Sequence, residues 1–292
     1  MSCSALRKAL VSVVFQFAKA HGSARFSGFT LVGNSARWDW PCGLEKLRNL
    51  KRCRADSTAR LCIRGGDGAA REIPIRQATD DLFRDVLPWR TFRWYYGQQH
   101  YSGSYWASTM SAHVTYESRL ELARLLMADF DTSVNHIVAQ PFMMQMPIAG
   151  KIRRHIPDYL LLTDDGPVVV DVKPAELLDD PKVAETFEWV HTVVDSLGWS
   201  FEIATEQPRV LIENVRFLAG YRRRTWVNES ALSQLRTRRL DGTSVGEAIH
   251  ATHGAEPLVR AALLRLLWTQ ELATDLSKVL SSTSILTVPG SS

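Results

Sequence analysis

Two short apolar runs joined by a turn, at residues 159–172, constrain the fold of this chain more strongly than any other segment. Tyr159-Leu-Leu-Leu162 is followed by Thr163-Asp-Asp-Gly166 and then by the β-branched run Val168–Val170. Aromatic and β-branched residues favour strands, and a polar tetrapeptide ending in Gly between two such runs favours a tight turn. The segment therefore predicts two antiparallel strands, and the absence of charge within the runs predicts that they are buried.

An acidic residue stands at each outer end of this predicted hairpin. Asp158, which follows Pro157, would begin the first strand, and Asp171 would end the second. Side chains alternate along a strand, so Asp171 and Lys173 would project to one side and Val172 to the other. Two carboxylates suit Mg²⁺, and a nearby ammonium can orient a water molecule and offset charge on a phosphate. We therefore expect metal-dependent phosphodiester hydrolysis, with Asp158, Asp171 and the carbonyl of Val172 as ligands of Mg²⁺ or a substituting Mn²⁺, and with Lys173 as a catalytic residue.

These residues resemble the PD-(D/E)xK nuclease superfamily, whose signature would consist of Pro157-Asp158 and Asp171-Val172-Lys173. Further segments look like the TnsA-type endonuclease subunit of heteromeric transposases, among them Tyr116–Leu126, Ala139–Phe142, Arg153–Asp158 and Asn214–Arg223. The resemblance implies an α/β fold with a restriction-endonuclease-like core, in which helices flank a mixed central sheet. It also implies a mainly helical, winged-helix-like C-terminal domain.

The resemblance further implies a function. The chain would be the DNA endonuclease subunit of a split transposase and would hydrolyse the non-transferred strand at the 5′ ends of a mobile element. The implied partners are double-stranded DNA at the element ends, an integrase-type transposase subunit and an ATPase regulator. In that family a glutamate from the helix before the hairpin joins the catalytic set, and Glu117 is the matching residue and a further metal ligand. Two alternatives stay open: a stand-alone restriction or repair nuclease, and a non-catalytic DNA-binding assembly module.

The helix that would carry Glu117 is predicted over residues 115–129. Its apolar residues recur at three- and four-residue steps, which is typical of an amphipathic helix, at Tyr116, Leu120, Ala123, Met127 and Phe130. Glu117 and Glu121 would share another face of this helix. For Glu121 we expect only a surface charge that supports the helix through pairs with residues three or four positions away.

Two basic runs are candidates for contact with DNA phosphates. The first directly precedes Asp158 and the second lies in the C-terminal part of the chain, where it could equally be an exposed helix end or a surface for a protein partner. The candidate residues are Lys151, Arg153, Arg154, His155, Arg222, Arg223 and Arg224.

The length of 292 residues and a hydrophobic content of 45% allow a sizeable core and two or three structural units. We assign residues 1–88 to an N-terminal extension of unclear role, 89–207 to the nuclease core and 208–292 to the C-terminal domain. Within that domain, apolar spacing predicts helices at 245–251, 258–268 and 272–280 and a strand at 285–288.

The net charge of +4 is compatible with a nucleic-acid partner but does not require one. The apolar run at residues 9–17 is too short to span a membrane. We therefore expect a cytoplasmic protein without a membrane partner.

Overall fold

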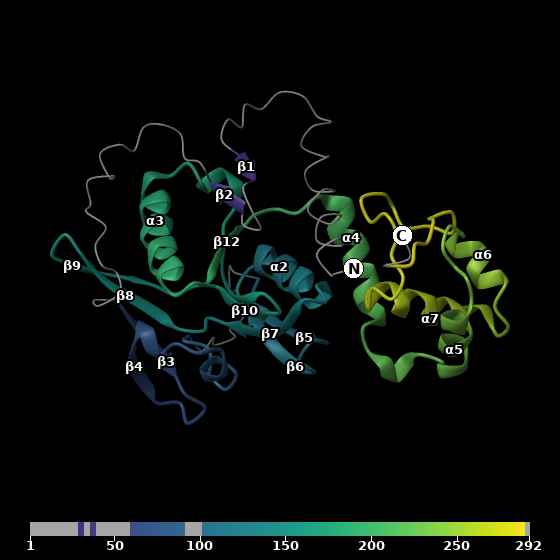
Figure 1. Cartoon of the computed structure of the whole chain (residues 1–292), viewed down its shortest axis with the longest axis horizontal. Coiled ribbons are helices and arrows are strands. Elements are labelled where there is room, and N and C mark those ends of the chain that lie inside the picture. The colour runs from purple at the N-terminus through teal and green to yellow at the C-terminus, as the bar shows by residue number, and fades with distance from the viewer. Residues whose placement is uncertain (1–28, 32–35, 39–58, 91–100, 290–292) are drawn as a thin grey trace. The chain divides into compact units, whose positions relative to one another are not determined.

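The computed structural model describes residues 29–31, 36–38, 59–90 and 101–289 (Figure 1). The chain divides into two compact units, Met1–Thr58 and Ala59–Ser292. In the first unit, β1 (Phe29–Leu31) and β2 (Ala36–Trp38) form an antiparallel pair. Every candidate site residue named above lies in the described part of the second unit.

The second unit has a mixed α/β structure. Its described strands are β3 (Arg60–Arg64), β4 (Ala70–Pro74), β5 (Gly103–Ala107), β6 (Ala112–Tyr116), β7 (Val134–Ala139), β8 (Met143–Ile148), β9 (Lys151–His155), β10 (Tyr159–Thr163), β11 (Gly166–Val172) and β12 (Ser200–Ala204). Its described α-helices are α2 (Arg119–Phe130), α3 (Pro181–Ser196), α4 (Arg209–Leu218), α5 (Glu229–Thr237), α6 (Val245–His250) and α7 (Glu256–Trp268). Short 3-10 helices include η5 (Ala219–Tyr221) and η6 (Arg224–Trp226).

The predicted hairpin is confirmed as β10 and β11, and it forms the middle of a four-stranded sheet ordered β12-β11-β10-β7. β10 is antiparallel to β11 and β7, whereas β11 and β12 are parallel, so the sheet is mixed. The turn ends at Gly166, whose φ of 108° is readily adopted only by a residue without a side chain. All five residues of β10 except Thr163 are buried, as the apolar sequence predicted.

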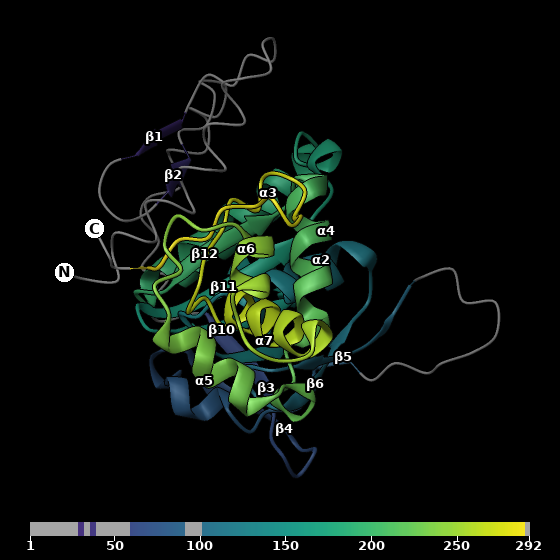
Figure 2. The same ribbon diagram turned by 90° about the vertical axis from the view of Figure 1, so that its right-hand side faces the viewer.

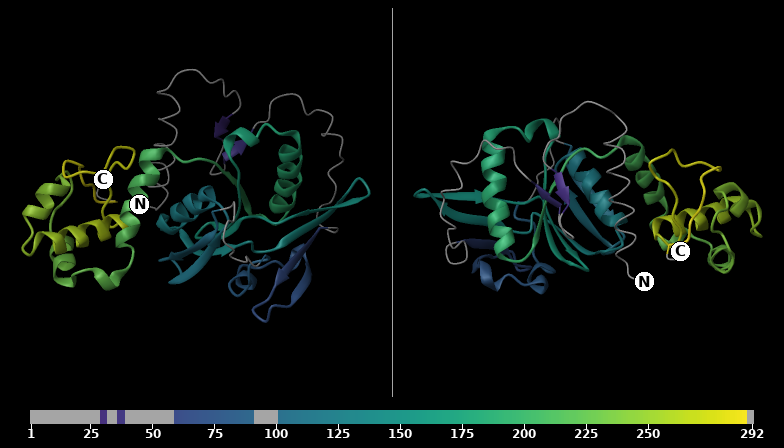
Figure 3. Two further views of the ribbon diagram at one scale, coloured as in Figure 1. Left: turned by 180° about the vertical axis from the view of Figure 1, so that it is seen from behind. Right: turned by 45° about the horizontal axis from the view of Figure 1, so that its top comes forward.

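Helices α2 and α3 cover opposite faces of this sheet, and the right-hand view of Figure 3 shows the strands between them. The face toward α2 carries Tyr159 and Val170, which belong to the same apolar cluster as the buried side of that helix. On the other face Phe187 of α3 meets Phe201 of β12, with ring centroids 5.9 Å apart. Because side chains alternate along β11, Asp171 lies on the face that α3 covers.

A second four-stranded sheet has the order β4-β3-β8-β9. Its strands β3 and β4 come from residues that the sequence assigned to the N-terminal extension, and β3 pairs with β8, which lies within residues 89–207. The β8–β9 hairpin turns at Ala149 and Gly150, both with positive φ, as a two-residue hairpin loop with the right twist requires. β9 lies at the open edge of this sheet.

The C-terminal helices α4, α5 and α6 pack around α7, which Figure 2 shows in front of the sheets. Their core is continuous with that of the β12-β11-β10-β7 sheet and α2. Trp268 of α7 packs against Phe130 of α2, with ring centroids 5.3 Å apart, and its indole N–H donates to Ser108 Oγ over 3.2 Å. The predicted helices at 245–251 and 258–268 are confirmed as α6 and α7.

The prediction of a helix at 272–280 is wrong, because this segment consists of turns, bends and an isolated bridge. Asp275 accepts hydrogen bonds from the backbone N–H and the hydroxyl of Ser277, at 3.1 and 2.5 Å, and such local bonds compete with a helix. Ala273 instead forms an isolated bridge with Thr287, and Ile285 forms one with Ser244. These bridges stand where the sequence predicted a strand at 285–288.

Within the part of the chain that the structure describes, no helix combines the length and the apolar character needed to cross a membrane.

Candidate active site

The two aspartates of the hairpin lie beside each other at the same end of β10 and β11. Asp158 directly precedes β10, and the register that pairs Tyr159 with Val170 puts Asp158 opposite Asp171. Asp158 Oδ2 accepts a hydrogen bond of 2.6 Å from the backbone N–H of Val172. Asp171 is 2% exposed. Asp158 was predicted to begin β10 and lies one residue before it, and Asp171 was predicted to end β11 and is its penultimate residue, so each prediction is correct to within one residue.

Burial is the main reason that the pKa of Asp158 rises from 3.8 to about 7, and the negative charge of Asp171 adds to it. The N–H of Val172 and the charge of Lys173 lower the pKa of Asp158, but they do not offset the larger effects. Near neutral pH the Asp158 carboxyl is therefore divided between its protonated and ionised forms. A cation bound between the two aspartates would offset the repulsion between their negative charges and favour the ionised form of Asp158.

His155, at the end of β9, binds Asp171. Its Nε2 lies 2.7 and 2.9 Å from the two carboxylate oxygens of Asp171. Because an ionised carboxylate only accepts hydrogen bonds, Nε2 is the donor. The His155 ring also meets the buried ring of Trp189 edge-on, at 6.2 Å between centroids. The sequence proposed His155 as a DNA contact, and the structure brings it against a predicted metal ligand.

Glu117 precedes the helix instead of lying on it, so the predicted start of that helix is wrong. Tyr116 still pairs with Gly103 in the β5–β6 hairpin, and α2 begins only at Arg119. The hydroxyl of Ser118 caps the helix by accepting the N–H of Glu121 at 3.0 Å. The helical spacing of apolar residues thus began at Tyr116, which belongs to β6, and this is why the predicted helix started too early.

Gln140 connects Glu117 with the segment that carries Asp158. Its side-chain amide donates to the carboxylate of Glu117, and its backbone N–H donates to the carbonyl of Asp158 at 2.9 Å. Its Oε1 accepts the N–H of Arg90 at 3.0 Å. Gln140 is buried and has a φ of 45°, a strained value for a residue with a side chain. No role for Gln140 was predicted from the sequence, because a Gln before a Pro does not signal such a conformation.

Glu121 lies beside Glu117 and makes the expected contacts with residues three and four positions away, but it is more buried than the surface charge that the sequence predicted. The side chain is partly buried and accepts the N–H of Glu117 at 2.8 Å. Burial raises the pKa of Glu121, while the positive charge of Lys173 is among the influences that lower it. The spacing Ser118-x-x-Glu121 is that of a capping box, which signals a glutamate turned toward the helix start.

Lys173 lies just after β11 and completes the group. Its backbone N–H donates to the carbonyl of Ala204 at 2.9 Å, which extends the parallel pairing by one residue. Its charge lowers the pKa of both Asp158 and Glu121, so the ammonium acts on carboxylates from two different elements. The structure thus sets Asp158 opposite Asp171, lets the charge of Lys173 act on Asp158 and Glu121, and links Glu117 to Asp158 through Gln140. Glu121 and Gln140 were not among the predicted site residues, whereas His155 was predicted as a DNA contact.

The second basic run does not join this group. Arg222 donates to the carbonyl of Trp106 at 3.0 Å, and its guanidinium lies 5.0 Å from the ring centre of Tyr105. Arg223 lies over the ring of Trp106 at 4.4 Å. Arg224 pairs with Glu229 at 2.8 Å. Arg222 and Arg223 are therefore used in contacts with the β5–β6 hairpin, and Arg224 in a contact with α5.

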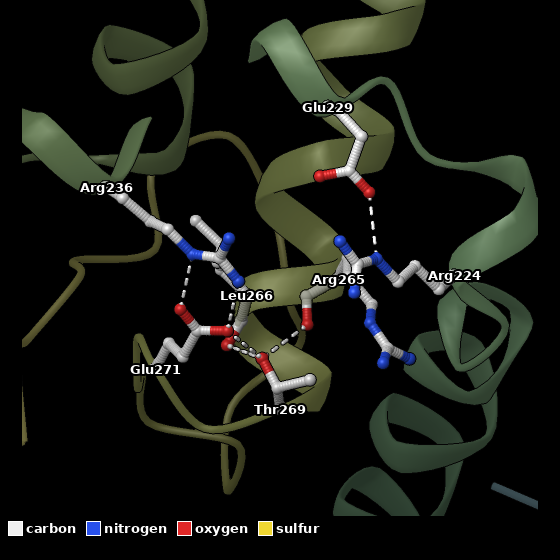
Figure 4. Close-up of polar contacts among 7 residues, drawn as sticks. All are labelled: Arg224, Glu229, Arg236, Arg265, Leu266, Thr269 and Glu271. Atoms are coloured by element: carbon white, nitrogen blue, oxygen red, sulfur yellow. Dashed lines mark hydrogen bonds and ion pairs between the residues drawn. The ribbon is translucent and has the colours of Figure 1, made fainter. Parts of the chain in front are cut away.

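Arg224 is part of a cluster of three arginines from η6, α5 and α7, which Figure 4 shows. Arg236 forms a two-pronged pair with Glu271, with contacts of 2.7 and 2.8 Å. Burial lowers the pKa of Arg265, and the charges of Arg224 and Arg236 lower it further. Arg265 nevertheless donates to the carbonyls of Tyr221 and Arg222, which ties α7 to the end of η5.

Residues 131–206 match the family model described as the TnsA-like endonuclease N-terminal domain. This segment therefore resembles a TnsA-like endonuclease domain. The match contains Asp158, Asp171 and Lys173, begins after Glu117 and ends before α4, so that it covers roughly a quarter of the chain. The TnsA-like segment thus includes the whole β12-β11-β10-β7 sheet and α3. Among curated proteins, none matches the chain.

Proposed function

We propose that this protein is the metal-dependent endonuclease subunit of a heteromeric transposase and that it hydrolyses the non-transferred strand at the 5′ ends of a mobile element. The observation that carries the proposal is the convergence of Asp158, Asp171 and Lys173 within a segment that matches a TnsA-like endonuclease domain. A PD-(D/E)xK core and a winged-helix-like C-terminal domain are part of the same proposal.

The residues at the end of the hairpin fit a hard divalent cation. Asp158 and Asp171 are adjacent carboxylates, and burial together with the charge of Asp171 raises the pKa of Asp158. Such a pair favours Mg²⁺, or Mn²⁺ in its place. The further ligands that we propose are the carbonyl of Val172 and Glu117, the latter through a bound water molecule. In the described residues no three His, Cys, Asp or Glu side chains converge closely enough to hold a metal alone. Backbone and water oxygens would therefore complete the ligand set, as is usual for Mg²⁺.

The metal, when bound, would activate water and stabilise charge on the phosphate. The ammonium of Lys173 would hold the attacking water and donate to a phosphate oxygen as negative charge develops there. Gln140 would keep Glu117 in place through its amide. His155 would orient Asp171, and it must give up one of its two contacts before Asp171 can bind a cation with that oxygen.

The proposed partners are double-stranded DNA at the element ends, an integrase-type transposase subunit and an ATPase regulator, in the cytoplasm. A stand-alone restriction or repair nuclease would use the same residues without a partner subunit. A non-catalytic assembly module would not need them. The presence of two adjacent aspartates and a lysine near both argues against the non-catalytic module.

Strand-specific cleavage of labelled element-end DNA tests the proposal. The assay is run in Mg²⁺ and in Mn²⁺, with and without the transposase subunit, for the wild type and for Asp171→Asn. Asp129→Asn is the matched control, because Asp129 is also buried but accepts its hydrogen bonds from Tyr105, Ser108 and Thr109, in the β5–β6 hairpin.

Cuts in the 5′ strand that need the partner, disappear in Asp171→Asn and persist in Asp129→Asn are the expected result. Cuts without any partner would favour the stand-alone nuclease. No cutting with either metal, with or without the partner, would favour the non-catalytic module.

A further inference from the structure

Strand β9 leads into the carboxylate site and is both exposed and basic. It forms the edge of its sheet, and the four residues Lys151–Arg154 are all exposed. Three of those four residues are cationic. An edge strand with this composition is protected against pairing with other strands, but its charges are also available to an anionic ligand.

The alternation of side chains divides these charges between the two faces of the sheet. Lys151 and Arg153 lie on the same side as His155, and Arg154 lies on the other. Two contacts identify the first side as the one toward α3: His155 reaches Asp171, and Arg153 pairs with Glu185 of α3 at 2.6 Å. The charge of Arg154 instead acts on Cys62 of β3, whose pKa it lowers slightly against a larger rise from burial.

Lys151 and Arg153 thus continue a line that begins at His155 beside Asp171. Residues two apart on a strand are separated by about 6.8 Å, since each residue advances the chain by about 3.4 Å. This separation is comparable with that of neighbouring phosphates along one nucleic-acid strand. Lysine and arginine side chains are also the usual partners of backbone phosphates, which they bind without regard to sequence.

We infer that Lys151 and Arg153 bind two successive phosphates of the DNA strand that leads to the cut, while Arg154 does not contact that strand. The inference rests on the proposed function and specifies which side of the β8–β9 hairpin meets the substrate. The sequence alone presented Lys151, Arg153 and Arg154 as one basic run, and only the pairing of β9 with β8 separates them.

In the free protein, Arg153 pairs with Glu185 at the position where we expect it to bind a phosphate. The side chains of Arg153 and Glu185 are 48% and 50% exposed, so the pair can exchange its partner at little cost. A DNA phosphate would take over Arg153 and leave Glu185 to solvent. Glu185 therefore competes with DNA, and its removal is expected to strengthen binding through Arg153 alone.

The test measures binding of the full chain to a fluorescein-labelled DNA duplex of random sequence by fluorescence anisotropy. EDTA is present so that no cutting occurs, and the affinity is followed over a series of KCl concentrations. Each phosphate contact contributes about 0.9 to the slope of log K against log salt. We expect Lys151→Ala and Arg153→Ala each to reduce the slope by about that amount, and Arg154→Ala, the matched control of equal charge, to leave it unchanged.

Glu185→Gln is expected to tighten binding about two- to fivefold, the range for loss of an exposed ion pair, and to have no effect in an Arg153→Ala background. The inference is overturned if Arg154→Ala reduces the slope as much as Arg153→Ala does, or if neither Lys151→Ala nor Arg153→Ala reduces it.

The binding and cleavage assays can fail separately. A chain that never cuts DNA but loses salt dependence in Arg153→Ala would overturn the proposed function and keep the phosphate contacts. A chain that cuts as proposed while every variant keeps the wild-type slope would overturn only the contacts.

Discussion

Replacing Asp158 by asparagine is expected to stabilise the metal-free protein at alkaline pH. The asparagine side chain has nearly the shape of aspartate and keeps an oxygen that can accept the N–H of Val172, now 2.6 Å from Asp158 Oδ2. It carries no charge, so it avoids the cost of burying a carboxylate beside Asp171. Both causes of the raised pKa of Asp158 therefore disappear.

The size of the effect follows from the pKa of Asp158, which is 3.8 in an ordinary environment and about 7 in the folded chain. A raised carboxyl pKa means that the folded state holds the proton more tightly than the unfolded state does. The resulting stability is fully present below pH 3.8 and is lost as the pH rises through about 7. Between pH 5 and pH 8 the wild type should lose about 2–3 kcal/mol relative to Asp158→Asn, as an upper limit for one group.

Urea unfolding in EDTA, followed by circular dichroism at several pH values, measures this difference. The gap in unfolding free energy between Asp158→Asn and the wild type should widen toward alkaline pH. Asp129→Asn is the control, because Asp129 accepts hydrogen bonds from three residues and should lose stability at every pH. A gap for Asp158→Asn that stays constant or narrows from pH 5 to pH 8 would refute the reasoning.

Three other substitutions test separate parts of the site. Lys173→Ala should reduce cleavage by about a hundredfold or more while the circular dichroism spectrum stays native, because the proposed role of this lysine is to stabilise charge in the reaction; a variant that cuts normally would remove Lys173 from the mechanism. Gln140→Glu should lower stability by about 1–3 kcal/mol in urea unfolding, since it replaces the amide donor to Glu117 with a second carboxylate; an unchanged midpoint would show that this contact has no energetic weight. Arg124→Ala should cost about 3 kcal/mol in the same assay, because the Arg124 side chain is 14% exposed and binds Glu202 through two bonds of 2.7 Å; a loss below about 1 kcal/mol would place this pair with ordinary surface ion pairs.

The central hairpin could be predicted from sequence because all of its determinants are local. Val168–Val170 favour a strand, and the tetrapeptide before them favours a turn, so the register followed and placed Asp158 opposite Asp171. The same holds for α3, whose apolar residues at helical spacing end at Gly198. A pair of candidate site residues that lies on one hairpin can therefore be predicted from a single sequence.

The rest of the site depends on choices that local patterns do not decide. Tyr116 fits both the last position of β6 and the apolar side of a helix, and the cap at Ser118 settles which residues belong to α2. The joining of β3 to β8 links residues far apart in the sequence, and no local preference encodes such a pairing. The role of Gln140 arises only once three segments have met, so it could not be predicted from sequence.

The continuous core between α7 and α2 determines how this protein can be divided. A chain ending at residue 207 would leave Phe130 without Trp268 and would expose the apolar side of α2 to water. Such a fragment is expected to aggregate, even though it would retain the whole TnsA-like segment. Because α2 begins beside Glu117 and ends at Phe130, a strain applied to the C-terminal helices would also reach the first turn of that helix and the glutamates there. The proposed catalytic residues and the C-terminal helices thus depend on one continuous apolar core.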